Sequence, residues 1–264
     1  MPISHEHKAI FVHVPKNAGE SIERSMGMYA GDMHQTLWGI FANRIVLQHL
    51  KAAELKDNYV SRELWDGYLK FAVVRNPWSK AVSEYNWYTR YGPTVPFYEW
   101  ARSLAARLKA NSCIHIEEVG HNVEQYKFLY AEEELLVDEV LYFENIRQDF
   151  SSLCKRMNWN VSLGHADTTK SRSSLDFRDY YCEETAEIIG EVYKKDIDIF
   201  GYDLNKTFAG HEISKQSKEL LDLFDPVRYL ELHQDVKDAG VDALEHYLNH
   251  GVKCHIPDGS MAVF

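Results

Sequence analysis

Two short apolar runs dominate the hydrophobic pattern, and each is followed by a turn and then by an amphipathic run. The apolar runs are Ala9–Val14 and Phe71–Val74. Continuous apolar runs of this length predict strands that are buried on both faces. Apolar residues at helical spacing follow each turn, over Ile22–Tyr29 and Ser79–Tyr91. Two strand–turn–helix units in succession predict an α/β fold built on a parallel sheet.

Later segments extend this pattern. Short strands are expected over Glu134–Val137 and Glu139–Phe143, and a helix is expected from Glu144 to about Met157. The amphipathic run Glu183–Phe200 predicts one long helix, which Gly201 ends. We therefore expect a P-loop-like parallel sheet with helices on both of its faces.

The turn after the first strand has the composition of an anion site. Pro15 ends the strand because it has no N–H to donate, and Lys16, the small pair Ala18-Gly19 and Ser21 follow. Such a loop points unpaired backbone N–H groups toward one place, at the positive end of a helix dipole. The sequence therefore predicts a phosphate site. The alternative is an ordinary strand–turn–helix with a solvated lysine.

The same loop matches the nucleotide-binding P-loop, G-x-x-x-x-G-K-[ST], only in part. Gly19 and Ser21 are in register, but Val14 stands in place of the first glycine and Glu20 in place of the lysine. A nucleoside triphosphatase needs that lysine on the β- and γ-phosphates. A nucleotide phosphotransferase is therefore the less favoured interpretation.

The second turn predicts a second anion contact. Arg75 stands at the end of its strand, Asn76-Pro77 turns the chain, and Ser83 lies about one and a half helical turns further on. A planar guanidinium together with a hydroxyl group makes a good clamp for a phosphate. The alternative for Arg75 is a structural salt bridge.

Both motifs resemble those of sulfotransferases that use 3′-phosphoadenosine 5′-phosphosulfate (PAPS). The run P-K-x-x-G-x-S is similar to their 5′-phosphosulfate loop, and R-N-P-x-x-x-x-x-S-x-Y is similar to their 3′-phosphate motif. The resemblance covers about residues 8–204 and points to the carbohydrate or heparan type, in a bacterial member. It implies metal-independent transfer of a sulfuryl group to a hydroxyl acceptor, expected to be a glycan, with adenosine 3′,5′-bisphosphate as the product.

The resemblance also implies roles for individual residues. Lys16 would be catalytic and would stabilise charge on the bridging oxygen as the phosphate leaves. Lys170 and Arg172, in a polar loop over residues 165–174, are candidates to bind the 3′-phosphate or adenine, the alternative being a plain surface loop. The full set of residues expected to bind the donor is Lys16, Asn17, Ala18, Gly19, Glu20, Ser21, Ile22, Arg75, Ser83, Lys170 and Arg172.

A histidine is the expected catalytic base, because imidazole titrates near neutral pH and transfer to a hydroxyl releases a proton. The run from His49 to Leu55 resembles the H-x-T-A-x-E-L segment of the two-motif carbohydrate sulfotransferases, which implies His49 as the base. His34 is the second candidate. The chain holds 13 histidines, so a structural role for either remains the alternative.

Glu20 departs from the family pattern, which has an uncharged residue at that position. A carboxylate facing a phosphosulfate would repel it by about 1–4 kcal/mol. Either Glu20 points away, or it pairs with a cation such as Arg24, or the loop has lost donor binding. The last case gives the alternative function: a catalytically inactive sulfotransferase-like protein that binds a glycan or a partner.

Charge and cysteine content limit the expected partners and the expected cellular compartment. The net charge of −11 provides no global basic field for nucleic acid or a heavily sulfated polymer. The four cysteines lack C-x-x-C spacing, which argues against a zinc site and favours a reducing compartment. No signal peptide and no apolar run of about 18 residues is evident, so we expect a cytoplasmic protein without a membrane span.

The chain divides into two expected units. Residues 1–207 form the sulfotransferase domain, and residues 214–264 form a small all-helical module after a linker. The tail resembles a module appended to bacterial polysaccharide-modifying proteins. Its histidines have no thiolate or carboxylate at metal-ligand spacing, so no metal is expected there.

Overall fold

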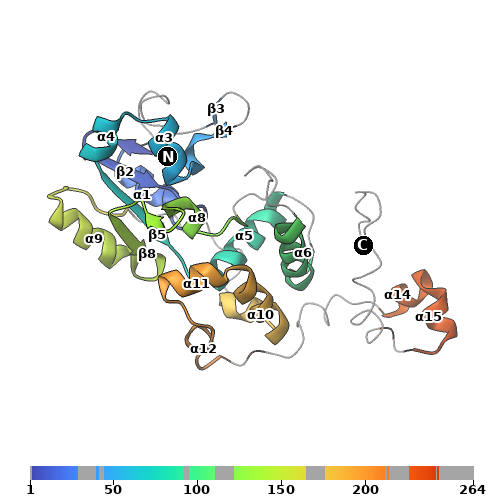
Figure 1. Ribbon diagram of the computed structural model, residues 1–264. Coiled ribbons are helices and arrows are strands. Elements are labelled where there is room, and N and C mark those ends of the chain that lie inside the picture. Colours follow the sequence, from blue (N-terminus) through green and yellow to red (C-terminus); the bar gives the residue numbers. More distant parts are fainter. Residues whose placement is uncertain are drawn as a thin grey trace.

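The computed structural model describes residues 2–28, 40–41, 45–91, 95–110, 122–164, 176–211, 213, 226–241 and 243 (Figure 1). Its strands are β1 (Ile3–Ser4), β2 (Ala9–Val12), β3 (Ile40–Phe41), β4 (Ile45–Val46), β5 (Leu69–Val74), β6 (Tyr130–Ala131), β7 (Glu134–Leu135) and β8 (Glu139–Tyr142). Its α-helices are α1 (Gly19–Ser25), α3 (Ala52–Asn58), α4 (Arg62–Gly67), α5 (Pro77–Tyr91), α6 (Phe97–Ala110), α8 (Tyr126–Leu129), α9 (Ile146–Arg156), α10 (Glu183–Val192), α11 (Lys194–Phe200), α12 (Leu204–Thr207), α14 (Pro226–Leu232) and α15 (Gln234–Asp238). Short 3₁₀ turns are η2 (Leu47–His49), η4 (Phe143–Asn145) and η5 (Phe177–Tyr180).

The central sheet has the order β1-β2-β5-β8. Strands β2, β5 and β8 are parallel, and β1 pairs with β2 in the antiparallel sense. The expected parallel sheet is therefore confirmed for these three strands, with an antiparallel edge strand added. Because parallel strands end at the same edge, the loops after Val12, Val74 and Tyr142 meet there.

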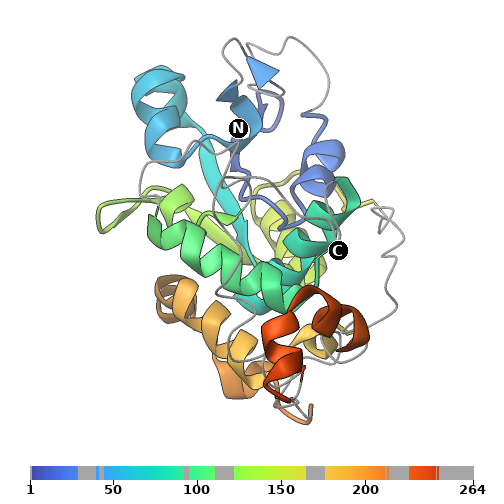
Figure 2. The same ribbon diagram turned by 90° about the vertical axis from the view of Figure 1, so that its right-hand side faces the viewer.

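Alternating side chains of the sheet face two separate hydrophobic layers. Ala9, Phe11, Phe71 and Val73 pack with α1 and α9. The intervening residues Ile10, Val12, Ala72 and Val74 pack with α3, α8 and the end of α11. The sheet is thus covered by helices on both faces, as Figures 1 and 2 show. Full burial on both sides explains why the strand sequences are continuously apolar instead of alternating.

A third hydrophobic cluster lies among α5, α6 and α10 and holds the large rings of Trp78, Trp100 and Tyr193. Phe208, just after α12, belongs to it and lies edge-on to Trp78 at 6.2 Å between ring centroids. In the tail, Tyr229, Val236 and Ala243 form a small cluster with one another. The α14–α15 pair is thus held by contacts within the tail.

Several predicted boundaries were wrong. The first strand ends at Val12, two residues early, because the chain turns before Pro15. The short strand expected over Glu134–Val137 covers only Glu134–Leu135, which pairs with β6. The long helix predicted over 183–200 is two helices, because Tyr193 has φ −107° and ψ 24°. The Tyr193 hydroxyl donates to the carbonyl of Asn122, which holds this break in place.

Helix α5 buries a lysine. Lys80 is 1% exposed, and its Nζ lies 5.5 Å from the ring centroid of Tyr193. Burial lowers the pKa of Lys80 to about 8, and the nearby carboxylates Glu84 and Asp196 only partly oppose this. In the folded protein, the protonated form of the Lys80 amine is therefore disfavoured relative to the neutral form, compared with the unfolded chain.

We expect stability to rise between pH 8 and 10.5. In that window the unfolded chain keeps the Lys80 proton while the folded chain has lost it, so the free energy of unfolding increases with pH, by about 3 kcal/mol in total. Urea unfolding of wild type and Lys80→Met across this range measures the difference. Equal pH dependence in both proteins would contradict the assignment.

Candidate functional site

The loop after β2, residues 15–21 (the Lys16 loop), has an unusual backbone. Lys16 has φ 68° and Ala18 has φ 62°, both in the left-handed region that side chains other than glycine seldom adopt. The N–H groups of Ser21 and Ile22 bond to the Ala18 carbonyl. Those of residues 16–20 meet no acceptor within the described part of the chain. A curled loop that presents consecutive free N–H groups is suited to an anion.

Asn17 is an internal tie and not a surface ligand. Its side chain is fully buried, and Nδ2 donates to the Val73 carbonyl at 2.8 Å and to Gln125 Oε1 at 2.7 Å. Among the described residues its Oδ1 has no partner. A ligand role for Asn17 therefore falls to its backbone N–H.

Gln125 clamps the backbone of Arg75. Its Oε1 accepts from the Arg75 N–H, and its Nε2 donates to the Arg75 carbonyl, both at 2.8 Å. Asp196 in turn accepts from the N–H groups of Gln125 and Tyr126 at 2.8 and 2.9 Å. Burial raises the pKa of Asp196 to about 6, so the two N–H donors hold a costly carboxylate.

The Arg75 side chain joins the two predicted motifs. Its Nη1 donates to the Lys16 carbonyl and its Nε to Ser79 Oγ, both at 2.9 Å. The guanidinium carbon lies 4.0 Å from the Phe143 ring centroid. Burial lowers the pKa of Arg75 to about 10, with Glu144 opposing. The predicted partner Ser83 is half-buried one helical turn beyond Ser79, on the same side of α5.

Helix α5 begins at this point because Asn76 caps it. Asn76 Oδ1 accepts from the N–H groups of Trp78 and Ser79 at 3.1 and 3.2 Å. Glu144 accepts from the Asn76 N–H at 2.7 Å and from the Tyr202 hydroxyl at 3.1 Å. Glu144 thus supports the cap, in line with a structural role.

Lys16 is a partly desolvated cation at the front of the site. Burial lowers its pKa, and the Coulombic attraction of Glu84 opposes that change. Its Nζ lies 5.7 Å from the ring centroid of Trp87, which is 41% exposed. An ammonium group and a partly exposed aromatic side chain therefore lie together beside the loop.

Glu20 does not point into the loop. Its side chain is 72% exposed and lies 4.0 Å from Arg24, one turn along α1. The structure thus combines two of the possibilities that the sequence left open: Glu20 is exposed to solvent, and it lies beside Arg24. Solvent screens its charge at this position, although the carboxylate still acts on Lys16, whose pKa it raises slightly against the effect of burial.

His49, in η2, lies against the strand end that precedes the loop. Its Nδ1–H donates to the His13 carbonyl at 3.2 Å, and the two rings meet edge-on with centroids 4.5 Å apart. A carbonyl can only accept, so the Nδ1 atom of His49 carries the hydrogen. In the neutral ring the Nε2 atom then holds the lone pair that a base needs.

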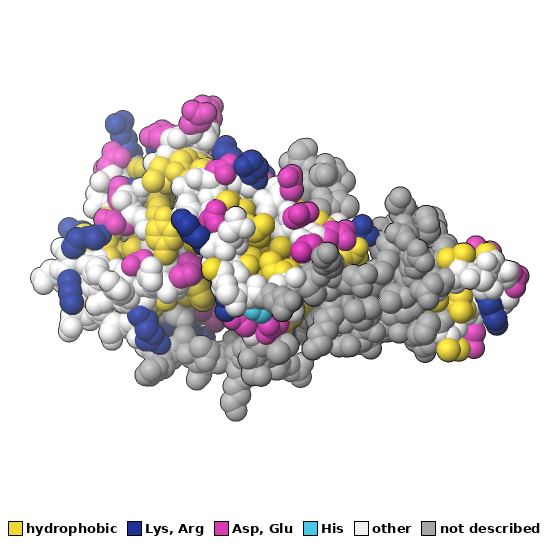
Figure 3. Space-filling model, turned by 90° about the horizontal axis from the view of Figure 1, so that it is seen from below, with side chains coloured by type: hydrophobic (Ala, Val, Ile, Leu, Met, Phe, Trp, Pro, Cys, Tyr) yellow, Lys and Arg dark blue, Asp and Glu magenta, His cyan; other side chains and the backbone are white. Residues whose placement is uncertain are grey.

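Three other predicted site residues, His34, Lys170 and Arg172, lie outside the described residues. Within the described part of the chain, no group of His, Cys, Asp and Glu could hold a metal ion. No helix there is long and apolar enough to cross a membrane. On the face drawn in Figure 3, the described Lys and Arg side chains are scattered among acidic and apolar ones.

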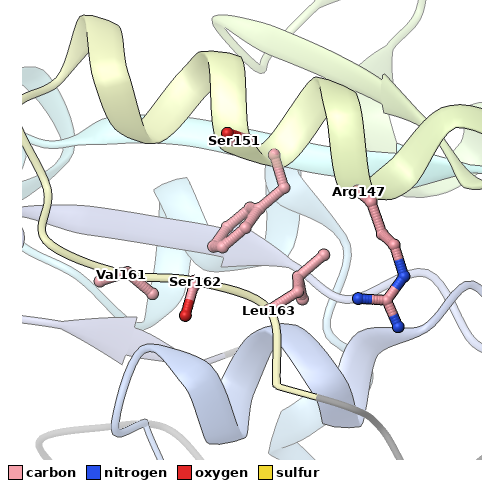
Figure 4. Close-up of a pocket in the computed structure, with 6 residues that line it drawn as sticks. Arg147, Ser151, Val161, Ser162 and Leu163 are labelled. Carbon is pink, nitrogen blue, oxygen red and sulfur yellow. The ribbon is translucent and has the colours of Figure 1, made fainter.

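A small pocket of about 170 Å³ lies elsewhere, between α9 and the segment that follows it. Arg147 hangs from α9 at its side, and Val161, Ser162 and Leu163 run below (Figure 4). It is smaller than the 300–1,000 Å³ typical of ligand pockets, and no predicted donor residue lines it.

Sequence reasoning missed Gln125, although it touches both motifs. No local sequence pattern indicates its role, because its partners Arg75 and Asn17 lie 50 and 108 positions away in the chain. Trp87 stands in a helix rich in aromatic residues, and such rings most often indicate core packing. Its exposure beside Lys16 is a property of the fold alone.

Removing the Gln125 amide should destabilise the protein. Gln125→Leu removes one of the two acceptors of Asn17 Nδ2 and both side-chain partners of the Arg75 backbone. We expect a loss of about 2–4 kcal/mol in the free energy of unfolding by urea denaturation. Gln125→Glu can still accept but cannot donate to the Arg75 carbonyl, so it should lose less. A Gln125→Leu protein as stable as wild type would refute the clamp.

Comparisons with known proteins agree with this geometry. The model of the sulfotransferase family matches residues 1–203. An uncharacterized protein of Archaeoglobus fulgidus is 31% identical over 100 residues, which are 38% of this chain and 76% of that relative. No solved structure matches. A family match over most of the chain, with both anion motifs inside it, leads to one conclusion: the chain belongs to the sulfotransferase family.

Proposed function

We propose that this sulfotransferase transfers a sulfuryl group from PAPS to a hydroxyl acceptor, and that the acceptor is a carbohydrate. The observation that carries the proposal is the hydrogen bond from Arg75 to the Lys16 carbonyl. It brings two anion motifs, 59 residues apart in sequence, to one edge of the sheet. A donor with a phosphate at each end of its ribose needs two such neighbouring sites.

The Lys16 loop is the proposed site of the 5′-phosphosulfate. The N–H groups of residues 16–20 and the Ser21 hydroxyl would donate to its oxygens, at the start of α1. Arg75, with Ser79 and Ser83 on one side of α5, would hold the 3′-phosphate. The second phosphate contact orients the donor and discriminates it from ATP.

Lys16 is the proposed electrostatic catalyst. Its ammonium group would stabilise the charge that develops on the bridging oxygen as the phosphate leaves. An oriented hydrogen-bond donor of this kind typically stabilises a transition state by about 3 kcal/mol. The lowered pKa of Lys16 reflects burial of its ammonium group. Because little water surrounds that group, its electrostatic attraction to a bound anion would be less screened than in bulk solvent.

His49 is the proposed base. Its Nδ1–H is bound by the His13 carbonyl, so its Nε2 would take the proton of the acceptor hydroxyl as the S–O bond forms. The leaving phosphate and the attacking oxygen would lie in line on opposite sides of sulfur.

Trp87 supports a carbohydrate acceptor. Trp87 is 41% exposed next to Lys16, and an indole ring packs well against the apolar face of a sugar. The bacterial and cytoplasmic setting stays a prediction. So does the division into residues 1–207 and 214–264, which the separate cluster of Tyr229, Val236 and Ala243 supports. The outward position of Glu20 removes the main reason for an inactive binding protein.

Donor binding should depend on Arg75. Calorimetric titration of adenosine 3′,5′-bisphosphate without magnesium should show binding to wild type, weakened about 30- to 100-fold in Arg75→Ala by the loss of charged hydrogen bonds. Arg75→Lys keeps the charge without the fork and should also bind more weakly. Arg62→Ala, which changes an exposed arginine on α4, is the control. No binding to wild type would overturn the donor assignment.

Turnover should depend on His49 while binding does not. With a panel of sugars as acceptors and release of adenosine 3′,5′-bisphosphate as the readout, His49→Gln should lower kcat about 100- to 1,000-fold. Its affinity for the bisphosphate should stay within about threefold of wild type. His5→Gln, on the exposed side of the fold, is the control. A His49→Gln enzyme with wild-type kcat would exclude it as the base.

A further inference from the structure

A buried carboxylate stands behind the Lys16 loop. Glu23, on α1, is fully buried, yet neither motif includes it. Its Oε1 accepts from the Nδ1–H of His13, and its Oε2 accepts from Gln48 Nε2 at 2.7 Å. One side chain thus ties α1 to the end of β2 and to η2.

The first of these partners supports the loop. The His13 ring lies directly under Gly19, so that a Cβ atom at position 19 would overlap it. On its other side the ring stacks on Phe11, with centroids 5.5 Å apart. The ring is 95% buried in this position, and its orientation is fixed by the bond to Glu23. Position 19 must therefore be glycine as long as His13 stays where it is.

Both partners also contact the proposed base. The His49 ring packs edge-on against His13, and its Nδ1–H donates to the His13 carbonyl. Gln48, the other partner of Glu23, directly precedes His49 in η2. His49 therefore adjoins both residues that Glu23 holds: it packs against His13 and directly follows Gln48 in the chain.

We infer that Glu23 is a positioning residue, which fixes the ring of His49 against the donor loop through His13 and Gln48. The inference rests on the proposed function, in which His49 is the base. A carboxylate suits the place because each of its oxygens accepts from one partner. Leucine would leave the buried His13 N–H and the half-buried Gln48 amide without this acceptor, and glutamine would offer one acceptor oxygen in place of two.

The arrangement couples the donor to the base. The same His13 ring touches Gly19 in the loop and the ring of His49, so a ligand that moves the loop alters the surroundings of His49. Binding of adenosine 3′,5′-bisphosphate should therefore shift the His49 ring signals, even though His49 belongs to neither anion motif.

The test compares Glu23→Leu, Glu23→Gln and the control Glu63→Gln, which changes an exposed glutamate on α4. Histidine ring ¹⁵N–¹H spectra read the protonated nitrogen of His49, assigned by its loss in His49→Gln. We expect a single Nδ1–H form in wild type and in Glu63→Gln, and a mixture in Glu23→Leu, with Glu23→Gln between them. Adenosine 3′,5′-bisphosphate should shift the His49 signal in wild type but not in Glu23→Leu.

An unchanged His49 signal in Glu23→Leu would overturn the inference. If circular dichroism shows that Glu23→Leu does not fold, Gln48→Met is used instead, because it removes the hydrogen bond from Gln48 to Glu23. An unchanged His49 signal in Gln48→Met would then overturn the inference. In turnover, Glu23→Leu should lower kcat about tenfold or more in wild type and add nothing in the His49→Gln background. An equal further loss in that background would indicate a merely structural role.

These results separate the inference from the proposed function. Wild-type turnover in His49→Gln would remove His49 as the base, while the spectra would still decide whether Glu23 orients it. Absence of bisphosphate binding to wild type would remove the donor, and the spectra of the free protein would decide the inference in the same way.

Discussion

The site depends on the side-chain amide of Gln125, which binds the end of one strand to the loop after its neighbour. Where β5 ends, the Arg75 backbone has a donor and an acceptor that no longer have sheet partners. Gln125 satisfies both and also accepts from Asn17. Because an amide offers both a donor and an acceptor, one side chain can meet these needs in a dry environment. The distance between the two anion motifs is thereby fixed before any ligand arrives.

Desolvated charge is the second theme of the structure. Burial lowers the pKa of Lys16 and Arg75, which means that each cation has lost hydration that its carboxylate neighbours restore only in part. A ligand with phosphates at both positions would supply the missing counter-charge. In the proposed complex, binding would offset the cost of burying these cations during folding, which would favour a nucleotide with two phosphates over a neutral ligand.

Sequence reasoning succeeded where the signal is local. The apolar runs predicted the central strands, because the residues concerned stand within a few positions of one another. The two anion motifs, which rest on loop and turn composition, stay predictions. Sequence reasoning failed for Gln125 and Glu23, whose partners are brought close only by the packed sheet. It also missed the break at Tyr193, where a hydroxyl bond to the distant Asn122 overrides an uninterrupted amphipathic pattern. Glu20 shows the converse case. The sequence suggested that its carboxylate would repel a phosphosulfate, whereas in the structure the side chain is exposed to solvent beside Arg24.

The central claim is that the free N–H groups of the Lys16 loop hold the phosphosulfate end of the donor. Hydrogen–deuterium exchange of a peptide covering residues 13–22, with and without adenosine 3′,5′-bisphosphate, tests it most directly. These amides have no acceptor among the described residues, so the ligand should slow their exchange markedly. Saturation of the protein with the bisphosphate without any protection of this peptide would contradict the claim and locate the nucleotide elsewhere.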